Sequence, residues 1–187
     1  MKPDPVETFC RALWKRDGDT IAKLLRRVDP NAKDRWGNTP VLMAAQFGEL
    51  KVMTVLLDRG GDIEQGRTQL TPLALAARRN ASDIVDFLRQ RGAAVSLLAS
   101  IILGDRDRLA RELTLDPSCA RHTDEGGTPF LHHAAESLHV GMVTLLLDGG
   151  ASVADADSNG ETALHRAADL RPAATGEPTP MPAIGTT

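Results

Sequence analysis

The sequence predicts an all-α fold, an α-solenoid of stacked helix-turn-helix repeats with short β-hairpin-like loops. Two patterns recur along the 187 residues. An apolar helical pattern starts at Ile21, Met53, Val85, Leu109 and Val143, with successive offsets of 32, 32, 24 and 34 residues. A threonine followed by proline or alanine, and then by paired alanines, stands at Thr39, Thr71, Thr128 and Thr162. Interleaved helical patterns with a period in the low thirties are typical of repeat arrays.

The composition favours thin helical layers over a large globular core. Hydrophobic residues make up 42% of the chain, but aromatic residues make up only 3% and tyrosine is absent. Aromatic side chains supply much of the buried area of a large core, whereas short stacked helices suit alanine and leucine. We therefore expect one elongated domain rather than two globular ones.

The unit around Thr39 shows how one repeat is built. An Asp-x-x-Gly turn precedes it, in which Gly37 supplies the positive φ that a tight turn requires. Thr39 is a suitable N-cap, and Pro40 suits the first helical position, where its missing N–H is not needed. Gly48 ends this short helix. A second apolar helix then runs from about Glu49 to a Gly-Gly pair that suits a left-handed C-cap.

The motif Thr39-Pro40-x-x-x-Ala44-Ala45-x-x-Gly48, with its leucine pair and closing glycines, resembles the ankyrin repeat. The same elements recur from Thr71 and from Thr162, and the resemblance covers roughly residues 6–170. It implies repeats of a β-hairpin finger and two antiparallel helices, stacked into a curved solenoid. It also implies a concave surface of finger tips and first helices, which binds a partner protein without catalysis.

Residues 1–170 are predicted to form one repeat domain of about five helix pairs and a terminal half repeat. The unit boundaries are expected at about residues 6–33, 34–65, 66–94, 95–122, 123–156 and 157–170. Residues 171–187 are predicted to be a disordered tail, because four prolines between residues 172 and 182 prevent an ordinary helix.

Three units depart from the pattern. The first is a degenerate copy with a polar outer face, as an N-terminal cap requires. The fourth is short, so its first helix is expected to start near Val95 with most of the hairpin finger missing. The fifth carries one extra residue beside Thr128-Pro129, and Leu138 replaces the glycine between its helices. We expect an altered helix start or turn in the fifth unit.

The net charge of −3 is unevenly distributed. Residues 1–94 carry 16 basic and 12 acidic side chains, a balance of +4, whereas residues 95–187 carry 6 and 13, a balance of −7. This asymmetry either orients a partner or has no function. No basic stripe with interleaved aromatic residues indicates nucleic-acid binding. No apolar run has the length of a membrane span.

The sequence contains no motif typical of catalysis or metal binding. GxGxxG, Walker A and GxSxG elements are missing, so we expect neither an enzyme nor a cofactor. Cys10 and Cys119 are too isolated for a metal site or a disulfide framework. His132, His133 and His139 are interpreted as structural, because no thiol or carboxylate completes a ligand set. Without a secretory signal, a cytoplasmic monomer is expected.

The candidate site is the concave surface that the resemblance implies. The predicted partner-binding residues are Arg35, Trp36, Asn38, Gln46, Phe47, Arg67, Thr68, Leu70, Arg78, Arg79, Ile102, Leu103, Asp124 and Glu125. Trp36 is either a binding hot spot or a stacking residue on the next finger. Phe47 is favoured to pack against the adjacent helix. Ile102 and Leu103 are either uncovered beside the missing finger or buried.

A regulatory role is the alternative, in which the chain occludes the active site of a partner enzyme, as an antitoxin, inhibitor or effector does. A third reading is a structural fragment of a larger scaffold. The sequence does not distinguish these roles, because one repeat scaffold serves many different surfaces.

Overall fold

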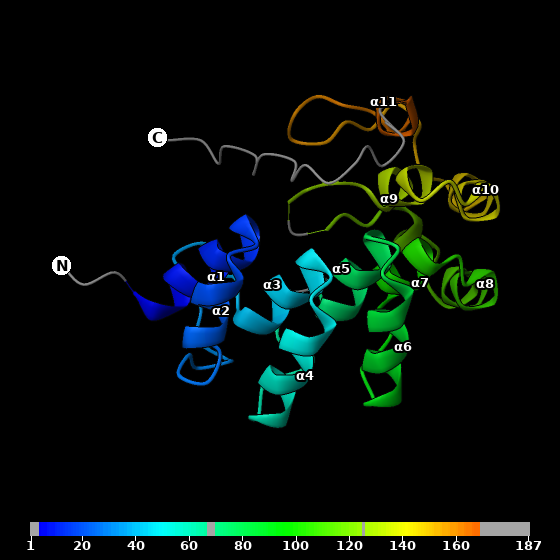
Figure 1. The fold of residues 1–187 in the computed structure, drawn as a ribbon. Coiled ribbons are helices and arrows are strands. Elements are labelled where there is room, and N and C mark those ends of the chain that lie inside the picture. Colours follow the sequence, from blue (N-terminus) through cyan, green and yellow to red (C-terminus); the bar gives the residue numbers. More distant parts are fainter. Residues whose placement is uncertain (1–3, 67–69, 125, 169–187) are drawn as a thin grey trace.

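A computed structural model describes residues 4–66, 70–124 and 126–168. Within these ranges the chain forms five helix pairs and one further helix (Figure 1). The pairs are α1 Pro5–Lys15 with α2 Gly18–Leu24, α3 Pro40–Phe47 with α4 Leu50–Asp58, α5 Pro72–Arg78 with α6 Ser82–Gln90, α7 Leu97–Leu103 with α8 Arg106–Leu115, and α9 Phe130–Glu136 with α10 Val140–Asp148. Helix α11 spans Ala163–Ala168, and a short 3-10 helix, Pro117–Arg121, follows α8. The predicted all-α solenoid is confirmed.

The helices stack in the order of the chain. Each first helix contacts the next, from α1 through α3, α5, α7 and α9 to α11. In Figure 1 these first helices lie on the inside of a bend, and the second helices α4, α6, α8 and α10 lie along its outside. One hydrophobic cluster runs through the stack from Val6 to Ala163. Leu56, Leu88 and Leu146 are fully buried in it, so the recurring leucines mark the layers of units two, three and five.

Side-chain caps start the first helices of units two to four. The hydroxyl oxygens of Thr39, Thr71 and Ser96 each accept a hydrogen bond from a backbone N–H of the first turn, at 3.1, 3.2 and 3.1 Å. Such caps satisfy donors that the helix itself leaves unpaired. The cap at Ser96 confirms that the fourth unit begins its first helix directly after Val95.

The first helix of the fifth unit starts without a side-chain cap. Pro129 occupies the N-cap position of α9 and offers no hydroxyl oxygen. Asp124 precedes Pro129 by the same spacing that separates Asp34 from Thr39, so no residue is inserted between turn and helix. The Thr-Pro pair is instead displaced by one position toward the turn. The expected change in the helix start is confirmed. Its cause is not an extra residue in the unit but this displacement of the Thr-Pro pair.

A left-handed residue ends each of the first helices α1, α3, α5, α7 and α9 and reverses the chain into the second helix of the pair. The five residues and their φ angles are Arg16 at 53°, Gly48 at 74°, Asn80 at 54°, Gly104 at 75° and Leu138 at 55°. This conformation costs little for glycine and more for a side chain with a Cβ atom. Leu138, which stands where the second and fourth units have glycine, therefore strains the turn of the fifth unit without changing the path of its backbone.

The fingers are short loops. Single β-bridges close two of them, between Thr123 and Pro129 and between Ala156 and Thr162. Residues 91–96 alone connect α6 to α7, a connection less than half as long as the one between α8 and α9. The predicted loss of the fourth finger is confirmed. In Figure 1 the loops before α9 and α11 project away from the second helices.

Candidate protein-interaction surface

The last two positions before each left-handed turn form a row across the first helices. They are equivalent in units two to five, because the same turn follows them. We call this row the helix-end rim; it consists of Gln46, Phe47, Arg78, Arg79, Ile102, Leu103, Glu136 and Ser137. All of these residues except Glu136 and Ser137 are predicted from the sequence, and counting back from Leu138 gives the remaining two. Arg78 and Arg79 are exposed, and the other rim residues except Ile102 are half-buried.

Ile102 does not face the surface. It is only 4% exposed, and its backbone oxygen accepts a hydrogen bond from Nε2 of His139 at 2.9 Å. The equivalent positions on either side carry Arg78 of α5 and Glu136 of α9, whose charged groups approach to 3.8 Å across the fourth unit. Ile102 is therefore corrected from a candidate contact to a core residue. Leu103 beside it stays half-buried.

The tip of the second finger is organised by contacts within the chain. The Arg35 guanidinium lies 4.0 Å from the centroid of the Trp36 ring, and it reaches Glu7 of α1 at 3.4 Å. Nδ2 of Asn38 donates to a carboxylate oxygen of Asp34 at 3.1 Å. Trp36 is half-buried. The cation–π contact with Arg35 thus holds the indole at the tip.

The remaining predicted residues lie on the third and fifth fingers. Leu70 is half-buried at the base of the third finger. Arg67, Thr68 and Glu125 lie outside the described residues, as does the predicted tail at 171–187.

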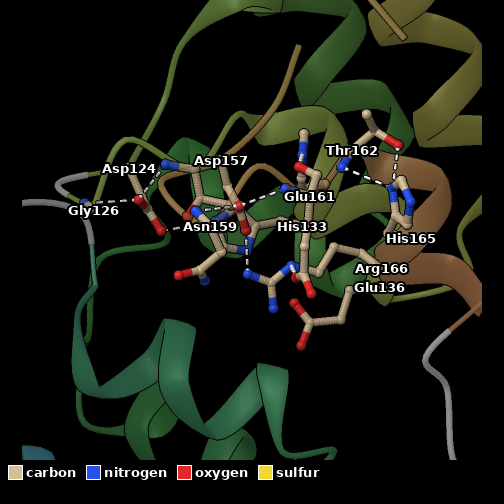
Figure 2. Close-up of polar contacts among 12 residues, drawn as sticks. Asp124, Gly126, His133, Glu136, Asp157, Asn159, Glu161, Thr162, His165 and Arg166 are labelled. Carbon is tan, nitrogen blue, oxygen red and sulfur yellow. Dashed lines mark hydrogen bonds and ion pairs between the residues drawn. The ribbon is translucent and has the colours of Figure 1, made fainter. Parts of the chain in front are cut away.

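A buried or half-buried aspartate holds the turn of three fingers. Asp34 accepts hydrogen bonds from the backbone N–H groups of Trp36 and Asn38, at 2.9 and 2.8 Å. Asp124 and Asp157 bind the N–H groups two and four residues ahead in the same way, at 2.8 to 3.0 Å (Figure 2). These carboxylates fix the finger geometry before any partner is bound.

The fifth finger is also tied to its own first helix. Nε2 of His133, on α9, lies 2.9 Å from Oδ2 of Asp124, and the His133 side chain is 2% exposed. Burial opposes ionisation of this carboxyl, but the bonds from His133, Thr128 and Gly126 outweigh it and lower the pKa of Asp124. Asp124, predicted as a partner contact, thus has its carboxylate engaged within the finger.

A charge cluster at the sixth unit was not foreseen. Arg166 of α11 pairs with Asp157 at 2.5 Å and with Glu161 at 3.3 Å. Burial opposes it, but Asp157, Glu161 and Glu136 raise the pKa of Arg166. Figure 2 shows Glu136 close to Arg166, which links this cluster to the rim. The repeated Asp-x-x-Gly spacing could have identified Asp157, whereas its arginine partner depends on the tertiary fold.

Three other histidines bond to backbone groups or helix ends. Nε2 of His132 lies 2.8 Å from the backbone oxygen of Glu161, and Nε2 of His139 binds Ile102, so both couple adjacent units. Nδ1 of His165 accepts from the backbone N–H three residues before it, at 3.1 Å. These bonds support the structural interpretation. Across the described part of the chain, no three His, Cys, Asp or Glu groups are placed to hold a metal ion.

The two cysteines are buried and unpaired. Burial, with added repulsion from Asp34 and Asp4, raises the pKa of Cys10 to about 12. Burial also raises the pKa of Cys119, as do the nearby acidic groups. Both thiols are therefore protonated at neutral pH, and a protonated thiol is a poor nucleophile.

Comparison with known proteins agrees with this repeat architecture. A family model described as ankyrin repeats matches residues 9–99 and 97–174. The chain belongs to the ankyrin repeat family. Ankyrin repeats are generally protein–protein interaction modules and are typically not catalytic. No helix within the described ranges is long and apolar enough to cross a membrane.

Several curated proteins contain a similar ankyrin segment. The chain is 29% identical to the Ankyrin repeat and KH domain-containing protein mask-1 of Caenorhabditis elegans over 142 residues, which cover 71% of the chain and 5% of that protein. It is 28% identical to human SH3 and multiple ankyrin repeat domains protein 2, over 79% of the chain and 9% of the relative. Phosphocholine transferase AnkX of Legionella pneumophila subsp. pneumophila is 27% identical over 83% of the chain and 18% of its own length. The chain thus spans less than a fifth of each of these three relatives.

Proposed function

We propose that this ankyrin array is a non-catalytic module that binds one partner protein through its finger tips and helix-end rim. The observation that carries the proposal is the chemistry of the rim. One repeat position carries Phe47, Arg79, Leu103 and Ser137 in units two to five, whereas a buried leucine recurs in the core of units two, three and five. Varied side chains on a uniform scaffold are suited to recognition of one specific surface.

The surface is preformed. Threonine and serine caps start the first helices, and aspartates fix three finger turns. A partner therefore binds groups that are already ordered, which reduces the entropy lost on association. Arg79 and Phe47 supply the guanidinium and aromatic groups that are common among binding hot spots.

We extend no transferase activity to this chain from AnkX, because the similarity covers only 18% of that protein. The unpaired, buried Cys10 and Cys119 are compatible with the reducing conditions of a cytoplasmic location. We propose that the protein is a monomer in the cytoplasm and binds its partner protein there.

Affinity capture from native lysate tests the function. The full chain is immobilised, and retained proteins are quantified by mass spectrometry. A protein retained by the wild type should be lost with Phe47→Ala/Arg79→Ala and kept by the matched outer-face variant Arg89→Ala on α6. Equal retention by the two variants would contradict binding through the rim. A captured enzyme whose activity falls on addition of the chain would support the inhibitory alternative.

A further inference from the structure

We propose that the partner presents a carboxylate to Arg79, from an aspartate or glutamate flanked by apolar side chains. This inference rests on the proposed function and specifies the chemistry of the partner surface. Three observations carry it: the local charge balance, the apolar residues at the equivalent rim positions of the adjacent units, and the missing finger of the fourth unit.

The charges around Glu136 do not balance. Arg78 approaches Glu136 at 3.8 Å, and the same carboxylate also acts on Arg79 and Arg166. Arg166 is already held by two carboxylates of its own finger. Arg78 and Arg79 therefore share one carboxylate between them. In the part of the chain that the structure describes, the Arg79 guanidinium has no ion pair or hydrogen bond of its own.

The surroundings of Arg79 disfavour an uncompensated positive charge. Partial burial and the adjacent Arg78 lower the pKa of Arg79, and the opposing effect of Glu136 is smaller. A carboxylate from a partner would compensate this charge. A guanidinium binds a carboxylate through two parallel N–H···O bonds, which gives direction as well as affinity.

The neighbours of Arg79 define what flanks the carboxylate. Phe47 of α3 and Leu103 of α7 occupy the equivalent position in the adjacent units, and both are half-buried. A partner that covers these apolar positions together with Arg79 would exclude water from the charge pair and strengthen it by lowering the local dielectric. They also provide contact area for aliphatic or aromatic side chains beside the acidic residue.

Arg79 is exposed, and the row of fingers is interrupted in the unit that follows it. Helices α5 and α7 lie side by side, and residues 91–96 connect the third unit to the fourth without a hairpin. No finger of the fourth unit therefore stands between the fingers of the third and fifth units. An extended acidic segment that crosses the first helices between these two fingers would therefore meet no fourth finger.

A phage-displayed library of random peptides is the probe, because it assumes nothing about the natural partner. The wild-type full chain should enrich peptides with an aspartate or glutamate next to an apolar residue. Changing that acid to its amide in a synthesised peptide should weaken binding about tenfold, the loss typical of a hydrogen bond between charged groups.

Three variants make the selection specific. Arg79→Gln should abolish the acidic preference, and Arg79→Glu should enrich lysine and arginine in its place. Arg89→Gln, at an exposed arginine of α6 on the outer face, should leave the preference unchanged. Helical circular dichroism confirms that each variant is folded before it is used.

Enriched peptides without acidic preference would overturn the carboxylate proposal, and so would a preference that survives Arg79→Gln. The proposal would also be overturned if the wild type enriched no peptide more strongly than the Arg79→Glu variant does. None of these results decides the proposed function, because lysate capture with the rim and outer-face variants tests that function separately.

Discussion

Arg78 and Glu136 meet at 3.8 Å although a whole repeat, the fourth, lies between the units that carry them. Each occupies the same position at the end of its first helix, and Ile102 fills that position between them. The fourth unit lacks a finger and contributes a buried isoleucine where its neighbours carry charged side chains. Units three and five thereby interact directly on the inner side of the bend.

This ion pair should add little to stability. About one third of each side chain is exposed, so water screens the attraction. A double-mutant cycle with Arg78→Ala and Glu136→Ala should give a coupling energy of about 0.5 kcal/mol or less by urea denaturation. A coupling energy above about 2 kcal/mol would mean that the pair is a desolvated, stabilising ion pair rather than a solvent-screened surface contact.

Leu138→Gly should stabilise the chain by about 1 kcal/mol, because Leu138 has a φ of 55° and the residue is 65% exposed. Relief of backbone strain then outweighs the small loss of packing. Asn80→Gly is the matched control and should gain less, because asparagine tolerates the left-handed region. Thermal denaturation measures both, and a destabilised Leu138→Gly variant would show that the leucine packs favourably.

Asp157→Asn should loosen the terminal half repeat. The Asp157 side chain is 1% exposed and holds Arg166 as well as the finger turn. Breaking a buried pair costs about 3 kcal/mol, which is enough to open a small terminal unit. Hydrogen exchange should accelerate across residues 157–168 and not in α3 or α5. The exposed Asp155→Asn is the control, and equal protection in both variants would argue against this role.

Stability should fall in acid partly through Asp124. Its pKa is lowered in the folded chain, so its stabilising contribution is complete above the unfolded pKa of about 3.9 and is lost as pH falls through the lower folded pKa. The difference in free energy of unfolding between wild type and Asp124→Asn should therefore shrink below about pH 4. Urea titrations across that range measure it. A constant difference would show that Asp124 does not titrate with unfolding.

Trp36→Ala should weaken binding of a captured partner by about 2 kcal/mol or more if the indole is a hot spot. Arg35 already orients the ring, so little ordering is needed on binding. Isothermal calorimetry with the purified partner gives the change, and circular dichroism checks folding. Unchanged affinity in the folded variant would leave Trp36 with a role within its own finger.

Local chemistry explains what could be predicted. Helix starts at Thr39, Thr71 and Ser96, and the turn at Gly48, depend on residues within one turn of the chain, which a sequence displays directly. The missing finger was visible as a shortened spacing. The Thr128-Pro129 displacement was harder to interpret, because it becomes clear only when the helix start is placed at Phe130.

The sequence by itself determined the repeat period, the starts of the first helices and the finger and helix-end positions of most units, because hydrophobic spacing and capping act over a few residues. Tertiary structure alone decided that Ile102 is buried, that Asp124 is engaged by His133 and that Arg79 has an unbalanced charge. Each of these depends on which side chains are brought together when the repeats stack. That juxtaposition depends on curvature, and curvature is set by packing across whole units.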